Sequence, residues 1–100
     1  MLIFLKRDHG AILRAAGKRR KMSQYEIGNP LTATKMTQHW PRAALYAPLR
    51  VTLFENESGG CTFAYDQPSS PFGQFGDDRV TEEARALDEE LKSALQRSAQ

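Results

Sequence analysis

Cysteine, histidine and long apolar runs are scarce in this sequence, and each shortage excludes a class of protein. The one cysteine, Cys61, cannot form an internal disulfide. A zinc site generally takes three or four Cys, His or carboxylate ligands at short spacings. Cys61 and the two histidines, His9 and His39, lie at least 22 positions apart. We therefore expect no structural metal, and nothing in the sequence indicates a cofactor.

The longest apolar run, Met1–Leu5, is far shorter than the roughly 20 residues that cross a bilayer as a helix. It also lacks the length and the small-residue cleavage site of a signal peptide. The sequence therefore favours a cytoplasmic protein without a membrane partner.

The chain has the length of one small domain, which we expect to occupy residues 1–100. With 40% apolar and 26% charged residues, its composition is that of a soluble globular protein. The net charge of +2 conceals a polarity along the chain. Residues 1–50 carry ten Lys and Arg against two Asp and Glu, and residues 51–100 carry four against ten. Halves of opposite net charge could attract each other between two copies of the chain.

The first part of the chain has the patterns of two strands and a short helix. Residues 2–6 form an apolar run, which is typical of a strand covered on both faces or lying at an interface. Asp8 can cap a helix that starts near His9, and Gly17 can end it. Alternation over Ser23–Ile27 predicts a second strand. Because about 15 residues with a helix separate the two strands, we expect a right-handed parallel crossover.

The middle of the chain predicts short helices followed by a hairpin. Residues 31–47 indicate short helical pieces, the second of which restarts at Pro41 and closes before Pro48. Apolar residues then alternate with polar ones over residues 49–53 and 61–65, on either side of a glycine-containing turn. This pattern predicts an antiparallel hairpin.

The last third predicts a loop and one long helix. Residues 67–77 are rich in Pro, Gly and Ser, which favours a loop. An apolar stripe then predicts a helix of about 20 residues, capped by Asp77 or Asp78. The residues of this stripe are Val80, Ala84, Leu87, Leu91 and Leu95. The predicted fold class is α+β in two layers: a mixed, mostly antiparallel sheet of about four strands, in the order β-α-β-α-β-β-α, with helices packed on one face.

A set of spaced landmarks runs through most of the chain. They are Asp8-His9, Gly28-Asn29-Pro30, Thr34, Met36, Pro41, Pro48-Leu49-Arg50-Val51, Glu55, Gly59, Tyr65 and Pro68. This pattern resembles the DUF302 (TT1751-like) family, and the resemblance extends to about Ala99. It implies a two-layer α+β fold and a tendency to form homodimers, and it brings no catalytic residues.

Members of that family usually begin with a further strand and helix ahead of the segment equivalent to Leu2–Arg7, and this chain lacks them. We therefore expect part of the apolar face of the sheet to be bare. Bare apolar surface above a few hundred Å² favours a partner.

Five residues of polar or turn character are candidates for a small-molecule site, because strand ends and loops are where the polar anchors of ligands lie. They are Asp8, His9, Asn29, Arg50 and Tyr65. Each has a plainer structural explanation: Asp8 caps a helix, Asn29 forms a turn, and Arg50 is solvated on the outer face of a strand. The loop over Pro68–Gly76 could cover a pocket or only pack its two phenylalanines on the sheet.

The function that these features favour is a non-catalytic ligand-binding or interaction module that works as a homodimer. One alternative is a small enzyme that uses Asp8 and His9, with Cys61 as a possible third member. Against it, Cys61 is expected at an inward-facing strand position, where a cysteine usually behaves as a small apolar residue.

A second alternative is nucleic-acid binding through the basic run Lys18–Lys21. Nucleic-acid modules usually add exposed aromatic side chains for stacking. Tyr25, Phe63 and Tyr65 fall on predicted core faces, so nucleic acid is the less favoured partner.

Overall fold

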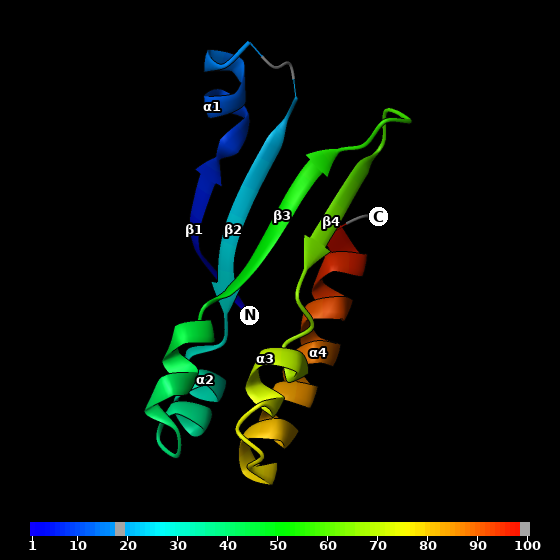
Figure 1. Cartoon of the computed structure of the whole chain (residues 1–100). Helices are drawn as coiled ribbons and strands as arrows, with labels where there is room; N and C mark the ends of the chain where they lie inside the picture. Colours follow the sequence, from blue (N-terminus) through cyan, green and yellow to red (C-terminus); the bar gives the residue numbers. More distant parts are fainter. Residues whose placement is uncertain (18–19, 99–100) are drawn as a thin grey trace.

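The computed structural model describes residues 1–17 and 20–98. Four strands form one antiparallel sheet in the order β1-β2-β3-β4, and helices pack against it as a second layer (Figure 1). This confirms the two-layer α+β class. The elements are β1 (Leu2–Asp8), α1 (His9–Ala15), β2 (Met22–Gly28), α2 (Pro30–Thr37), the 3-10 helix η1 (Pro41–Tyr46), β3 (Leu49–Glu55), β4 (Cys61–Tyr65), α3 (Ser69–Gly73) and α4 (Asp78–Ser98).

The predicted parallel crossover between the first two strands is wrong, because β1 and β2 pair antiparallel. Leu2 lies opposite Gly28, and Asp8 lies opposite Ser23. A parallel connection needs a helix that packs across a face of the sheet and returns the chain to the start of the first strand. The helix instead continues beyond the end of β1, and the chain turns back there (Figure 1).

The helix α1 forms as predicted, but its apolar side is not buried. The carboxylate of Asp8 caps it, and Gly17 after it has the positive φ of 80° that suits glycine. Ile12 is 69% exposed, and Gly10 is the only buried residue of the helix. The expectation that all helices pack on one face of the sheet therefore holds for the later helices and not for α1.

The hairpin of β3 and β4 is confirmed, with Val51 opposite Tyr65 and Glu55 opposite Cys61. Its turn is organised by Asn56. The side-chain oxygen of Asn56 accepts hydrogen bonds from the backbone N–H groups of Ser58 and Gly60, at 3.1 and 3.0 Å. This arrangement replaces the strand ladder where the chain reverses.

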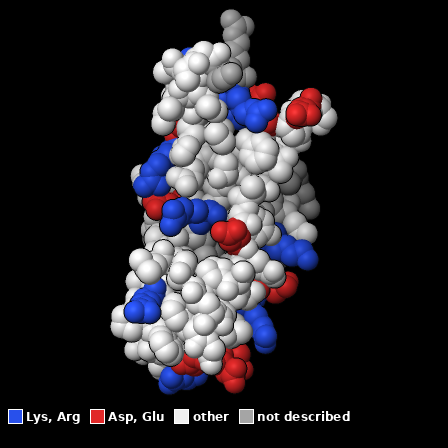
Figure 2. Space-filling model, viewed as in Figure 1, with Lys and Arg blue, Asp and Glu red and all other residues white. Residues whose placement is uncertain are grey.

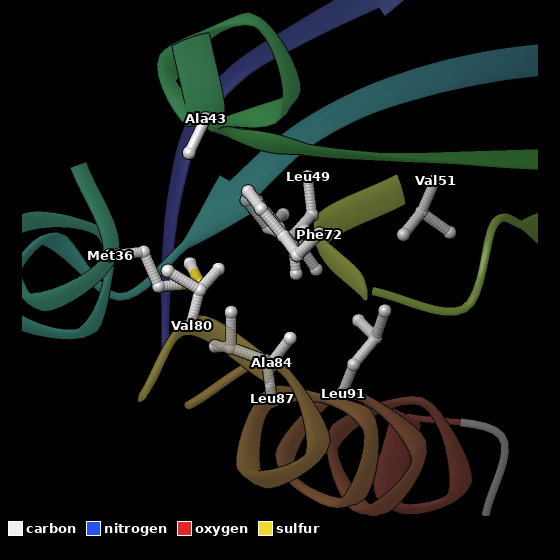
Figure 3. Close-up of a cluster of buried hydrophobic side chains, with 10 residues drawn as sticks. Met36, Ala43, Leu49, Val51, Phe72, Val80, Ala84, Leu87 and Leu91 are labelled. Atoms are coloured by element: carbon white, nitrogen blue, oxygen red, sulfur yellow. The ribbon is translucent and has the colours of Figure 1, made fainter. Parts of the chain in front are cut away.

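The core lies between one end of the sheet, where β2 ends and β3 begins, and the helices α2, η1, α3 and α4 (Figure 3). The stripe predicted along the last helix is confirmed, since four of its five residues are buried and Leu95 is half-buried. These side chains face Phe72 of α3 and strand residues Leu49 and Val51 (Figure 3). No helix of the described residues is long and apolar enough to cross a membrane.

The predicted loop over residues 67–77 contains a short helix, α3, and on this point the prediction is wrong. Phe72 in this helix is fully buried. Asp88 of α4 anchors the segment, because it accepts hydrogen bonds from the Ser69 backbone N–H at 2.8 Å and from the Gln67 amide at 3.1 Å. Tertiary contacts with α4 thus impose a helical turn on a sequence whose local composition favours a loop.

Candidate functional site

The first pair of candidate residues, Asp8 and His9, lies at the start of α1. The Asp8 carboxylate accepts a hydrogen bond from the Ala11 backbone N–H at 3.1 Å and lies 3.4 Å from the Arg14 guanidinium. The Ala11 N–H, and after it the Arg14 charge, lower the pKa of Asp8. His9 is half-buried in the first turn. Asp8 therefore works as a helix cap and stays ionised at neutral pH.

Asn29 likewise caps a helix. Its side-chain oxygen accepts hydrogen bonds from the backbone N–H groups of Leu31 and Thr32, at 3.1 and 3.4 Å. Pro30 follows at the first helical position, where its missing N–H costs nothing. The Gly28-Asn29-Pro30 landmark is thus the start of α2.

Arg50 and Tyr65 lie near the open end of the hairpin, Arg50 in β3 and Tyr65 in β4. Arg50 is exposed on the outer face of β3, opposite Glu26, which itself lies 3.3 Å from the Arg7 guanidinium. Tyr65 ends β4 and is 39% exposed. Arg50 is exposed, as expected for a solvated side chain on the outer face of a strand. Tyr65 was predicted on a core face, but it does not belong to the core.

These five residues do not form one site. Asp8 lies opposite Ser23 and Asn29 follows Gly28, so about 17 Å of strand separates the two ends. Cys61 is also far from His9, because it begins β4 at the other edge of the sheet, about 14 Å away across three strand spacings. A nucleophile and base cannot meet at that distance.

Cys61 was predicted to behave as a small apolar residue at an inward-facing strand position. It is exposed, so this prediction is wrong. It starts β4 at the end of the sheet that α4 does not reach, so no helix covers it (Figure 1). Among the described residues, no group of three His, Cys, Asp or Glu could hold a metal ion.

The basic run of the nucleic-acid alternative is only partly described. Lys18 and Arg19 lie outside the described residues, and Arg20 and Lys21 are exposed. In Figure 2, basic and acidic side chains of the described residues are intermingled over the visible face. That face therefore does not separate into a positive and a negative half, although the charges separate along the sequence.

The feature that the candidate residues did not indicate is an apolar groove of about 570 Å³. It lies between the inner face of the sheet and the last turns of α4. All four strands contribute, with Ile3, Tyr25, Val51 and Phe63 among the lining side chains, and α4 adds Leu95. No spacing in the sequence could reveal it, because its residues come from five separate elements.

A smaller apolar hollow of about 280 Å³ lies beside the Gly28-Asn29-Pro30 turn. Phe4, Met36 and Phe72 are among its lining residues. A Cβ atom at position 28 would lie 3.4 Å from the Phe4 ring, so glycine lets the strand and this ring approach closely. The Asn29 side chain is already committed to capping α2, which leaves this hollow without a free polar anchor on that residue.

The exposed surface of β1 is the other unusual feature. β1 is an edge strand, and all of its residues are exposed. Its four consecutive apolar residues, Leu2–Leu5, have exposed fractions of 42–68%. The register of β1 on β2 shifts between Ile3 and Leu5, so Phe4 forms a bulge. This apolar segment is a surface that soluble monomers rarely leave bare.

Comparison with known families assigns the chain. A family model described as a domain of unknown function, DUF302, matches residues 1–98. The chain belongs to the DUF302 family. It is similar in structure to an uncharacterized conserved DUF302 protein from Bacillus stearothermophilus, with a TM-score of 0.84 and 18% identity. That match covers 95% of this chain and 75% of the other. A comparison with curated proteins finds no match.

The landmarks of this DUF302 chain now have structural roles. Asp8 and Asn29 cap helices, Gly28 admits the Phe4 ring, and Tyr65 ends a strand. These structural roles do not account for two apolar surfaces of the described residues, the β1 segment and the groove.

Proposed function

We propose that the protein is a non-catalytic interaction module that works as a homodimer, with Leu2–Leu5 of each copy as the contact. The observation that supports it is the exposure of four consecutive large apolar side chains on an edge strand. Burying them against an identical segment across a two-fold axis removes apolar surface from water on both copies at once.

The chemistry of β1 favours side-chain packing over a continuous sheet between the copies. The bulge at Phe4 twists the edge, and Lys6 and Arg7 place positive charges on its second half. Bulges and edge cations both oppose strand-to-strand pairing. The contact is therefore confined to the apolar first half of β1.

The enzyme alternative receives no support from the geometry, because Asp8 is used as a cap and the Cys61 thiol lies at the opposite edge from His9. We further assign the protein to the cytoplasm. An exposed single thiol suits a reducing compartment.

The test is the molecular mass in solution, measured by sedimentation or light scattering at micromolar concentration. We expect about twice the chain mass of 11.3 kDa. Leu5→Lys should give the monomer mass, because it places a charge in the contact of both copies. The introduced lysine lies opposite Glu26 of β2, and this pair of opposite charges supports the pairing of β1 with β2 in the variant.

The matched control is Leu45→Lys, which changes an exposed leucine (69%) on η1 that lines neither the groove nor the smaller hollow. This variant should remain dimeric. A wild-type protein that sediments as a clean 11.3 kDa species would contradict the proposal. So would a dimer that Leu5→Lys leaves intact.

A further inference from the structure

The groove on the inner face of the sheet has the size and walls of a ligand site. Its volume of about 570 Å³ lies inside the range of roughly 300–1,000 Å³ for small-molecule pockets. Its walls are formed by aromatic and aliphatic side chains, including Tyr25, Leu53, Phe63 and Leu95. Tyr25, Phe63 and Leu95 pack against the core without being fully buried. The groove therefore offers an apolar lining to an occupant from solvent.

One end of this lining is positively charged. Arg97, in the last turn of α4, is the only charged side chain among the lining residues. It forms no ion pair with any residue of the described ranges 1–17 and 20–98. The hydroxyl of Ser98 beside it donates to the Ala94 carbonyl at 2.9 Å and keeps its lone pairs for a polar ligand group.

Two further cations lie at the groove. The N-terminal ammonium of the lining residue Met1 is paired with Glu90 at 3.3 Å, and the Lys6 ammonium lies 5.7 Å from the ring centre of Tyr25. An apolar cleft with cations at its rim is complementary to an amphipathic anion.

We propose that the groove binds a fatty acid, with the alkyl chain along the sheet and the carboxylate on the Arg97 guanidinium. The planar guanidinium can donate two parallel hydrogen bonds to a carboxylate. The chain needs no polar partner, and the four strands supply apolar contact along its length. Leu2 and Ile3 belong both to the proposed dimer contact and to the groove lining, whereas Leu5 does not line the groove. Leu5→Lys therefore tests the dimer without changing a wall of the groove, and Arg97→Gln tests binding without changing the dimer contact.

The first experiment is calorimetric titration of the full chain with octanoate, decanoate and dodecanoate below their micelle concentrations. The affinity should rise about fourfold for each added CH2 until the alkyl chain fills the groove. Dodecyltrimethylammonium has an alkyl chain of the same length with the opposite charge and should bind more weakly than dodecanoate. Equal binding of the two, or an affinity that does not depend on chain length, overturns the proposal.

The second experiment separates the head group from the chain. Arg97→Gln should weaken dodecanoate binding by about tenfold and leave binding of uncharged dodecanol unchanged. Arg85→Gln removes an exposed cation of α4 that does not line the groove, and it should bind dodecanoate like the wild type. Unchanged dodecanoate binding by Arg97→Gln overturns the assignment of the head group.

The third experiment locates the ligand. Dodecanoate should shift the methyl NMR signals of Val51 and Leu95, which line the groove. It should not shift those of the exposed leucines Leu31 of α2 and Leu45 of η1. Ala94→Phe fills part of the groove and should abolish these shifts in a protein that still melts cooperatively. Shifts at Leu31 or Leu45 alone overturn the proposal.

Discussion

At the scale of single residues, several polar side chains are used to start helices. Asp8 and Asn29, two of the candidate ligand anchors, begin α1 and α2, and Asp77, predicted as a cap, begins α4. Asp77 is the most connected of them. Its carboxylate accepts hydrogen bonds from the Arg79 backbone N–H at 2.9 Å, the Arg79 guanidinium at 2.8 Å and the Trp40 indole N–H at 2.9 Å. It thereby joins the start of η1 to the start of α4.

These contacts predict how stability depends on pH. The hydrogen bonds from Arg79 and then from Trp40 hold the pKa of Asp77 well below its usual 3.8. The unfolded chain therefore binds more protons than the folded one below about pH 4, so this stabilisation is complete above that pH and is lost as the pH falls. In thermal melts, the advantage of the wild type over Asp77→Asn should shrink between pH 7 and pH 3.

The control for this experiment is Asp78→Asn, which removes the neighbouring carboxylate and keeps the Asp77 contacts. Its melting temperature should fall in parallel with that of the wild type over the same range. Parallel curves for the wild type and Asp77→Asn would contradict the role assigned to Asp77.

At the scale of elements, α4 and β1 show opposite outcomes of apolar patterning. The stripe of α4 has a helical period and meets α3, α2 and the sheet, so Leu91 is fully buried. The apolar residues of β1 are consecutive, and one edge of this strand has no neighbour among the described residues. The long helix therefore supplies four of the ten buried core residues, and the strand supplies a surface.

This difference predicts where truncation is costly. Leu91→Ala should lower the free energy of unfolding by about 2–5 kcal/mol, measured by urea denaturation, because it leaves a cavity under the sheet. Lys92→Ala, one residue further on the exposed side, should change it by less than about 0.5 kcal/mol. If Leu91→Ala does not fold, Leu91→Met should still cost less than about 1.5 kcal/mol. Equal effects at the two positions would refute this account of the core.

At the scale of the whole molecule, the chain is elongated. Its radius of gyration is 15.2 Å and its extents are 45 × 28 × 21 Å, whereas a compact domain of this length has a radius of about 13 Å. The cause is visible in Figure 1: the upper part of the sheet and α1 project beyond the helices that cover the lower part. The proposed dimer contact lies at the other end of β1, since Leu2 is opposite Gly28, and so leaves this projecting part uncovered.

The dimer predicts that stability depends on protein concentration. Because dissociation accompanies unfolding, the wild-type melting temperature should rise by roughly 5–10 °C over a hundredfold increase in concentration. Leu5→Lys should melt at the same temperature throughout this range. Scanning calorimetry at several concentrations measures both, and a concentration-independent wild-type melt would be evidence against the dimer.

The sequence allowed the hairpin, the long helix and the cap at Asp8 to be predicted, because each depends on neighbouring residues and a local period. Asn29 was predicted as a turn residue, and its role as the cap of α2 is seen only in the structure. The direction of β1 was predicted wrongly, since it depends on where α1 packs and not on the number of connecting residues. The helix at Phe72 was missed because its contacts with Asp88 and α4 are distant in sequence. The groove was missed for the same reason.

The sequence by itself therefore determined the family, the α+β class and the positions of most elements, since periodicity and capping are properties of short segments. Only the tertiary structure decided which apolar residues are covered. Leu91 and Leu2 are both leucines in regular elements, yet one is fully buried and the other is 56% exposed. Burial depends on what packs against a side chain, and that neighbour comes from another part of the fold. The proposed β1 contact and the proposed fatty-acid site both rest on that difference.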